Sequence, residues 1–124
     1  MAAKKIGLYG GTFDPIHNGH VKVVVQLLSK NIVNEIILIP AGQPQLRKTG
    51  PVASGLDRLA MCELAVKGIE NVRVSDIEIK RTGASYAIDT VIEMQNMNPG
   101  AELFWIIGSD AYEKIGDWHR SAEF

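Results

Sequence analysis

The residues best suited to chemistry lie in one segment near the start of the chain, Gly10-Gly11-Thr12-Phe13-Asp14-Pro15-Ile16-His17-Asn18-Gly19-His20. The two leading glycines let the backbone approach a phosphate closely, and the segment ends in an expected helix start, which offers free N–H groups and a positive dipole end. His17 and His20 are three residues apart, so both imidazoles could point into one opening. As hydrogen-bond donors they could bridge phosphate oxygens and stabilise charge on a leaving pyrophosphate.

A simpler interpretation of the same residues is an ordinary glycine turn followed by histidines that only cap a helix. The context favours the functional interpretation, because the segment follows an expected strand and precedes an expected helix. The chain lacks the GxGxxG and GxxxxGK[ST] patterns. Dinucleotide-dependent oxidoreductases and P-loop nucleoside triphosphatases are therefore poorly supported.

The elements that must position this segment follow from the pattern of apolar residues. Continuous apolar runs predict strands at residues 6–9, 35–40 and 103–107. Alternating apolar residues predict a further strand at residues 72–79, with a bulge or bend near Asp76, where the alternation changes phase. Helical spacing predicts helices over residues 19–30, 56–66 and 87–94, the last with Ser85 as N-cap. Alternating strands and helices predict a single α/β domain over residues 1–124, with a Rossmann-like parallel sheet and helices on both faces. Ligands are then expected at the carboxyl ends of the strands, where residues 10–20, 41–48 and 108–110 fall.

Composition narrows the classes of protein that remain. The 124 residues are 46% apolar and 22% charged, as in ordinary globular domains, and the net charge of −1 gives no general attraction for nucleic acid or a membrane. The single cysteine, Cys62, falls in a helical pattern and is expected to be buried, which excludes a disulfide scaffold and indicates a reducing compartment. Neither a signal peptide nor a run of transmembrane length is present, so a cytoplasmic location is expected.

The segment from Gly10 to His20 resembles the signature of the HxGH nucleotidylyltransferase superfamily, which has a Rossmann-like fold. Within it, the chain most resembles the bacterial nicotinate-nucleotide adenylyltransferases. The supporting segments lie in that family's order along almost the whole chain: Ile39-Pro40-Ala41-Gly42-Gln43-Pro44, Asp57-Arg58-Leu59-Ala60-Met61, Arg81-Thr82-Gly83-Ala84-Ser85-Tyr86-Ala87-Ile88-Asp89-Thr90, and Ile106-Ile107-Gly108-Ser109-Asp110 with Trp118 beyond.

The resemblance implies adenylyl transfer from ATP to nicotinate mononucleotide, a step of NAD biosynthesis that yields nicotinate adenine dinucleotide and pyrophosphate. It also implies that Mg²⁺ assists, although it assigns no protein ligands to the ion. The acceptor phosphate would attack directly, in a reaction that needs alignment and charge stabilisation more than an enzyme nucleophile. The catalytic residues would be Thr12, His17 and His20. The residues that bind ATP and its phosphates would be Gly10, Gly11, Thr12, Phe13, His17, Gly19, His20, Gly108 and Asp110, and those that bind the acceptor would be Arg47, Tyr86, Asp89 and Trp118. The partners are thus ATP and a pyridine mononucleotide, and a homo-oligomer stays open.

Three of these residues have simpler interpretations that the sequence leaves open. Arg47, with Lys48 beside it, could be a solvated loop cation, and Tyr86 could pack at a helix start. Trp118, proposed to stack on the pyridine ring, could be a core tryptophan. Asp110 follows a strand, where a carboxylate can bind ribose hydroxyls or a metal ion.

The chain also departs from the family's pattern. It has Gln45-Leu46-Arg47 where many relatives have Pro-His-Lys, and Ala87 where a hydroxyl residue is common. It has no Ser-Ser-Thr-x-x-Arg type segment, so we expect a domain truncated at its C-terminus. Three alternatives follow: transfer to another phosphate acceptor such as phosphopantetheine, a nucleotide-binding module without activity, and an interaction domain that only shares the fold.

Overall fold

The computed structural model describes residues 3–11, 13, 16–42, 54–80 and 87–106. These form, in chain order, β1 (Lys5–Gly11), α1 (Asn18–Ser29), β2 (Glu35–Pro40), α2 (Gly55–Ala65), β3 (Val72–Val74), α3 (Ile77–Lys80), α4 (Ala87–Met97) and β4 (Glu102–Ile106). The strands lie in the order β3-β2-β1-β4, and every neighbouring pair is parallel. The predicted parallel sheet is confirmed.

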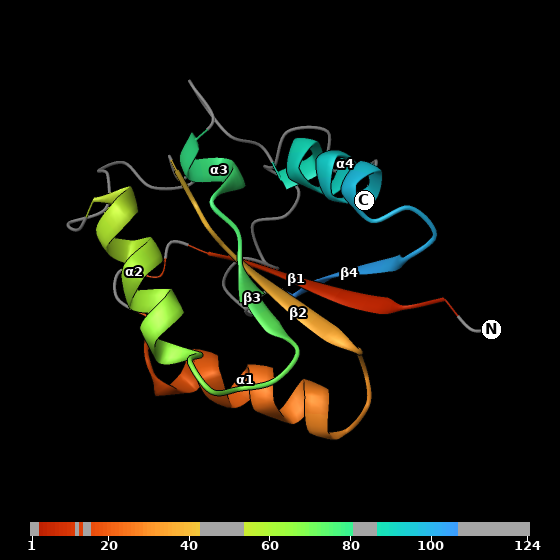
Figure 1. Ribbon diagram of the computed structural model, residues 1–124, viewed down its shortest axis with the longest axis horizontal. Helices are drawn as coiled ribbons and strands as arrows, with labels where there is room; N and C mark the ends of the chain where they lie inside the picture. Colours follow the sequence, from red (N-terminus) through yellow and green to blue (C-terminus); the bar gives the residue numbers. More distant parts are fainter. Residues whose placement is uncertain (1–2, 12, 14–15, 43–53, 81–86, 107–124) are drawn as a thin grey trace, which may run out of the picture.

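Helices cover both faces of this sheet, as the apolar strands predict. Figure 1 shows α1 and α2 on one side and α3 and α4 on the other. On the first side Val24 of α1 and Cys62 of α2 pack with Ile36 and Leu38. On the second side Met94 of α4 packs with the opposite face of the same strands, in a cluster completed by Ile6, Leu8, Ile37 and Ile39. Residues 36–39 are fully buried because β2 is covered on both faces.

The predicted strand over residues 72–79 is wrong in its second half. β3 ends at Val74, and residues 77–80 form the short helix α3. The Ser75 hydroxyl accepts the Ile77 N–H at 3.3 Å, and the Lys80 N–H donates to the Asp76 carbonyl at 2.9 Å. A 3.1 Å ion pair joins the side chains of Asp76 and Lys80. The change of pattern near Asp76 therefore marks the start of a helical turn, with these local contacts favouring helix over strand.

Helix α2 has the predicted extent but a different buried face. Its inward side chains are Arg58, Cys62 and, at the helix end, Val66, spaced four residues apart. Leu56 and Leu64 are 72% and 71% exposed. The expectation that Cys62 is buried is confirmed, whereas the apolar side chains around it do not all face the core. Ser85, the predicted N-cap of α4, lies outside the described residues.

The carboxyl ends of three strands meet at one edge of the sheet. Gly11 pairs with Pro40, the Ala41 N–H donates to the Gly11 carbonyl at 2.8 Å, and Tyr9 pairs with Ile106. The last residues of β1, β2 and β4 therefore all lie at this edge, which we call the carboxyl edge. Within the described ranges, no helix has the length and apolarity to span a bilayer.

Candidate active site

His17 and His20 shape the start of α1 through a pair of reciprocal hydrogen bonds. His17 is the N-cap, and its Nδ1 accepts the Gly19 N–H at 3.1 Å. The Nδ1 of His20 accepts the His17 N–H at 3.0 Å. Together the two bonds form a capping box, which satisfies two backbone donors that the helix start would otherwise leave unpaired. The simpler interpretation of these histidines, as helix caps, is therefore correct as a description of their backbone contacts.

Capping also determines where each imidazole carries its proton. An Nδ1 that accepts a hydrogen bond carries no proton, so each neutral ring has its proton on Nε2. Neither Nε2 takes part in the capping box. The cap thus leaves each ring with one N–H donor available to a ligand, and the capping and phosphate-binding interpretations are compatible.

The structure brings the two rings together. Their centroids are 3.8 Å apart and their planes are inclined by 26°, so they stack. His17 is exposed and His20 is half-buried, and no acidic side chain occupies the first turn of α1. Two imidazole donors therefore lie at the positive end of a helix dipole that no carboxylate of that turn neutralises, an arrangement suited to an anion.

Aromatic side chains beneath the pair hold His20 in place. The Phe13 ring meets the His20 ring edge to face at 5.0 Å, and the Tyr9 ring lies 6.0 Å away. Phe13 is 3% exposed and has a positive φ of 49°, which turns its side chain back into the core beneath Gly11. A phosphate contact by Phe13 would have to come from its backbone, since its side chain supports His20.

The pKa of His20 is lowered from its ordinary value of 6.5, first by burial and then by the neighbouring His17. As the pH falls below 6.5, the unfolded chain binds a proton at this position before the folded chain does. The contribution of neutral His20 to stability is therefore complete above 6.5 and is lost as the pH falls toward the folded pKa.

We expect this loss to be visible in urea unfolding at a series of pH values between 8 and 5. The wild-type chain should lose more free energy of unfolding over that range than His20→Gln, whose amide oxygen can still accept the His17 N–H but does not titrate. Equal losses in the two proteins would contradict the assigned environment of His20.

Gly19 leaves the space that the His17 imidazole occupies. A β-carbon at Gly19 would lie 2.9 Å from Cε1 and 3.0 Å from Nδ1 of His17, so the imidazole would have to move. We expect Gly19→Ala to change the free energy of unfolding by less than about 1 kcal/mol, because alanine's better helix propensity offsets a weaker cap. We expect its affinity for ATP, measured by calorimetry, to fall about tenfold. Wild-type affinity in this variant would show that the position of the His17 ring is irrelevant to binding.

Gly10 marks a second close approach at the carboxyl edge. A β-carbon there would lie 2.8 Å from the Trp105 ring of β4. The glycine therefore allows the indole to pack directly against the backbone at the end of β1. This contact accounts for Gly10 through packing, and it leaves open whether the same backbone also meets a phosphate.

The remaining predicted site residues divide into two groups. Asp89 is half-buried in the first turn of α4, next to Thr90, whose hydroxyl donates to the Glu78 carboxylate of α3 at 2.6 Å. Because α3 follows β3, this bond places the first turn of α4 at the carboxyl edge. The other predicted residues lie outside the described part of the chain: Thr12, Arg47, Tyr86, Gly108, Asp110 and Trp118.

Three buried polar residues at the carboxyl edge were not predicted as site residues: Arg58, Glu78 and Thr90. One signal for Arg58 is present in the sequence, since it is four residues before Cys62 and eight before Val66. A charged residue on the buried stripe of a helix is unusual and marks a specific contact. Glu78 carried no such signal, because the helical turn that buries it was expected to be a strand.

The described residues contain no cluster of three or more His, Cys, Asp or Glu side chains able to hold a metal ion. Mg²⁺ in phosphoryl-transfer sites is commonly held by substrate phosphates and water with few protein ligands. The donors at the start of α1 are imidazole N–H groups, which suit phosphate oxygens. The site therefore fits an ion that arrives with a nucleotide.

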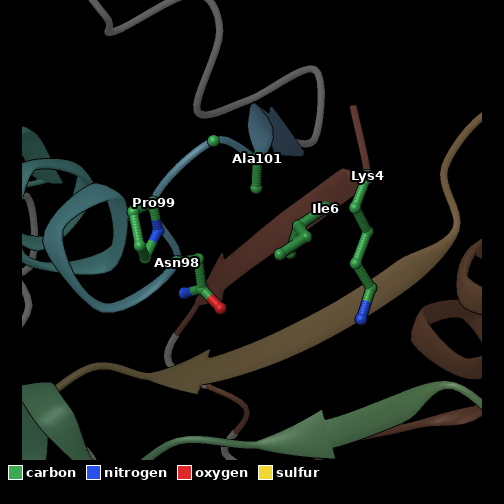
Figure 2. A pocket seen from close by; sticks show the side chains of 6 residues that line it. Lys4, Ile6, Asn98, Pro99 and Ala101 are labelled. Carbon is green, nitrogen blue, oxygen red and sulfur yellow. The ribbon is translucent and has the colours of Figure 1, made fainter. Parts of the chain in front are cut away.

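A pocket of about 240 Å³ lies at the opposite end of the sheet, between the start of β1 and the turn after α4 (Figure 2). Its polar side chains are engaged in structural contacts. Lys4 pairs with Glu35 at 2.6 Å, and the Asn98 side-chain oxygen accepts from Arg73 at 3.3 Å. We do not assign this pocket to the active site.

A parallel sheet whose first strand ends in two glycines, with paired imidazoles at the start of the following helix, defines a nucleotidyltransferase-type domain. The model of the cytidylyltransferase-like family matches residues 8–124, and the chain belongs to that family.

Among named relatives, "Probable nicotinate-nucleotide adenylyltransferase" of Methylacidiphilum infernorum (isolate V4) is 42% identical over 119 residues, covering 96% of this chain and 58% of the relative. A protein of the same name from Neisseria meningitidis serogroup C (strain 053442) is 44% identical over 117 residues, covering 94% of this chain and 59% of the relative. The chain thus spans a little under three fifths of the length of these relatives.

Solved structures show the same fold. Plasmodium falciparum nicotinic acid mononucleotide adenylyltransferase complexed with NaAD superposes with a TM-score of 0.83 at 20% identity, covering 97% of this chain and 59% of that one. The same enzyme complexed with APC gives 0.80 at 20% identity, with 97% and 58% coverage. At this identity the likeness establishes the fold, and the Rossmann-like prediction is confirmed.

Proposed function

We propose that this chain transfers the adenylyl group of ATP to nicotinate mononucleotide, giving nicotinate adenine dinucleotide and pyrophosphate. The observation that supports this most strongly is the stacked His17–His20 pair at the start of α1, with both Nε2–H groups free of the capping bonds. Its relatives at about 42% identity carry the name of this activity. We place the reaction in the cytoplasm, in keeping with a free and buried Cys62.

In the proposed reaction an oxygen of the acceptor phosphate attacks the α-phosphorus of ATP. The bond from that phosphorus to the bridging oxygen on the pyrophosphate side breaks, and the leaving pyrophosphate takes the electron pair. The Nε2–H groups of His17 and His20 donate to the phosphate oxygens on which this charge develops, and the helix dipole adds to their effect. No covalent enzyme intermediate is needed, because the enzyme's task is alignment and charge stabilisation.

Mg²⁺, bound mainly by the triphosphate, would supply additional neutralisation of the phosphate charge. The chain's own contribution would be to orient that triphosphate against the backbone of Gly10 and Gly11 at the end of β1. Thr12, Gly108 and Asp110 are proposed to contact ATP as well, and Arg47, Tyr86, Asp89 and Trp118 to contact the acceptor.

The test is pyrophosphate release by this chain with Mg²⁺, with each nucleotide donor combined in turn with each acceptor. We expect turnover with ATP and nicotinate mononucleotide. Turnover with phosphopantetheine alone would refute the acceptor, and turnover with CTP alone would refute the donor. Calorimetry with ATP and Mg²⁺ accompanies the assay, since ATP binding without turnover on any acceptor would identify a nucleotide-binding module and refute the enzyme.

A further inference from the structure

Three buried polar side chains at the carboxyl edge have no role in the reaction as described above. Arg58, Glu78 and Thr90 are 1%, 8% and 0% exposed. Burying such groups costs free energy unless they make specific hydrogen bonds. The hydrogen bonds that these side chains make therefore indicate which parts of the fold they hold together.

Arg58 joins the two ends of the segment between β2 and α2. Its Nη1 donates to the carbonyl of Ala41, directly after β2, while Arg58 itself lies in α2. A β-carbon on Gly55, at the start of α2, would lie 3.6 Å from its Nη2. The guanidinium thus contacts Ala41, two residues before positions 43–53, and lies beside Gly55, the first helical residue after them.

Glu78 and Thr90 join the two ends of the next segment in the same way. Glu78 belongs to α3 and Thr90 to α4, and the Thr90 hydroxyl donates to Glu78 Oε2 at 2.6 Å. Positions 81–86 lie between the two helices in sequence. Because Asp89 directly precedes Thr90, this bond also fixes the part of α4 that carries Asp89.

We call the Arg58–Ala41 and Glu78–Thr90 hydrogen bonds the two ties, and the residues around them pack against each other. A β-carbon at Gly42 would overlap the backbone carbonyl of Glu78, and one at Gly55 would lie 3.1 Å from Cγ2 of Ile79. The end of β2, the start of α2 and the helix α3 therefore form one packed cluster, which the Glu78–Thr90 bond extends to α4. Because the cluster is closely packed, displacing the residues of one tie is expected to displace those of the other.

We propose that Arg58, Glu78 and Thr90 are positioning residues for the acceptor half of the site. They hold the end of β2, the start of α2 and the helix α3 in a fixed relation to the first turn of α4, which carries Asp89. This inference rests on the proposed function, which assigns Asp89 to the pyridine mononucleotide. The ATP half of the site is built on β1 and α1. Loosening this cluster should therefore weaken binding of the acceptor more than binding of ATP.

The kinetic test compares Thr90→Val with Thr90→Ser. Valine keeps the shape and removes the hydroxyl, whereas serine keeps the donor to Glu78. We expect Thr90→Val to raise the KM for nicotinate mononucleotide about tenfold, with the KM for ATP changed less than about twofold. Thr90→Ser should restore the wild-type KM, and Arg58→Met should behave like Thr90→Val.

Arg73→Met is the matched control. Arg73 also contacts two partners, Glu35 at 2.6 Å and Asn98 at 3.3 Å, but these lie at the opposite edge of the sheet. We expect wild-type KM values for both substrates in this variant. Equal rises in both KM values in Thr90→Val, or a rise in acceptor KM in Arg73→Met, would refute a specific positioning role.

Amide hydrogen exchange tests the cluster without relying on turnover. The Lys80 N–H is bonded to Asp76 within α3, and the Asn98 N–H is bonded to Met94 at the far end of α4. We expect Thr90→Val to speed exchange at Lys80 about tenfold relative to Asn98, and Thr90→Ser to leave it unchanged. Unaltered Lys80 exchange would refute the tie. Faster Lys80 exchange in a chain that turns over no pyridine mononucleotide would support the tie and refute the proposed function instead.

Discussion

Replacing His20 with alanine is expected to lower the rate of adenylyl transfer by about 10²- to 10³-fold, the usual loss when one donor to a developing oxyanion is removed. The rate is measured as pyrophosphate release at saturating ATP, and calorimetry provides the affinity for ATP in parallel. The effect should be on reactivity more than on folding, because the half-buried ring contributes less to the core than Phe13 beneath it. An unfolded His20→Ala chain would contradict this placement.

His17 allows the capping role to be separated from the phosphate-binding role. His17→Ala should lose about 1 kcal/mol of stability, since alanine cannot cap α1, and should also lose activity. His17→Asn should recover the stability, because asparagine is a preferred N-cap, while its shorter side chain cannot place a donor where the imidazole Nε2 lies. Wild-type turnover in His17→Asn would show that His17 is only a cap.

The second large effect is expected at Gly42, where Gly42→Ala should destabilise the fold by about 3 kcal/mol. Its β-carbon would overlap the carbonyl oxygen of Glu78, a backbone atom that cannot move aside as a flexible side chain can. This overlap can be relieved only if β2 and α3 move apart, which would strain both the Arg58 contact and the Glu78 contact. Urea unfolding measures the loss.

Gly68→Ala is the control for this prediction. Gly68 has a φ of +87°, and no atom lies within 4 Å of the place that a β-carbon would take, so alanine there suffers only backbone strain of about 1 kcal/mol. Gly42→Ala should therefore cost clearly more than Gly68→Ala. A Gly42→Ala chain as stable as the wild type would mean that β2 and α3 are not in contact as described.

Most of the sheet could be predicted from the sequence because most of its strands have little ambiguity. Residues 35–40 are continuously apolar and end in proline, and they form the fully buried β2. Residues 72–79 were ambiguous for a physical reason: Val72 and Ile79 suit a strand, but Ser75 and Asp76 make local bonds that start a helix. Short side-chain contacts of this kind outweigh apolar alternation when the strand would have only one neighbour.

The site was predictable to the extent that it depends on local spacing. Two histidines three residues apart at a helix start must lie near each other, and the structure stacks them. Their mutual capping could not be deduced, because it depends on ring orientation and on the room that Gly19 provides. The Arg58 and Glu78 contacts were beyond prediction because their partners are 17 and 12 residues away in sequence and meet only in the folded sheet.

The most direct test of the central claim is a long-range ¹H–¹⁵N NMR spectrum of the histidine rings, recorded with and without a non-hydrolysable ATP analogue and Mg²⁺. Without nucleotide, both His17 and His20 should show an unprotonated Nδ1 and a protonated Nε2. Adding the analogue should shift both Nε2 resonances while the Nδ1 atoms keep their capping bonds. Protons on Nδ1 in the free chain, or Nε2 resonances that do not respond to the analogue, would contradict the account.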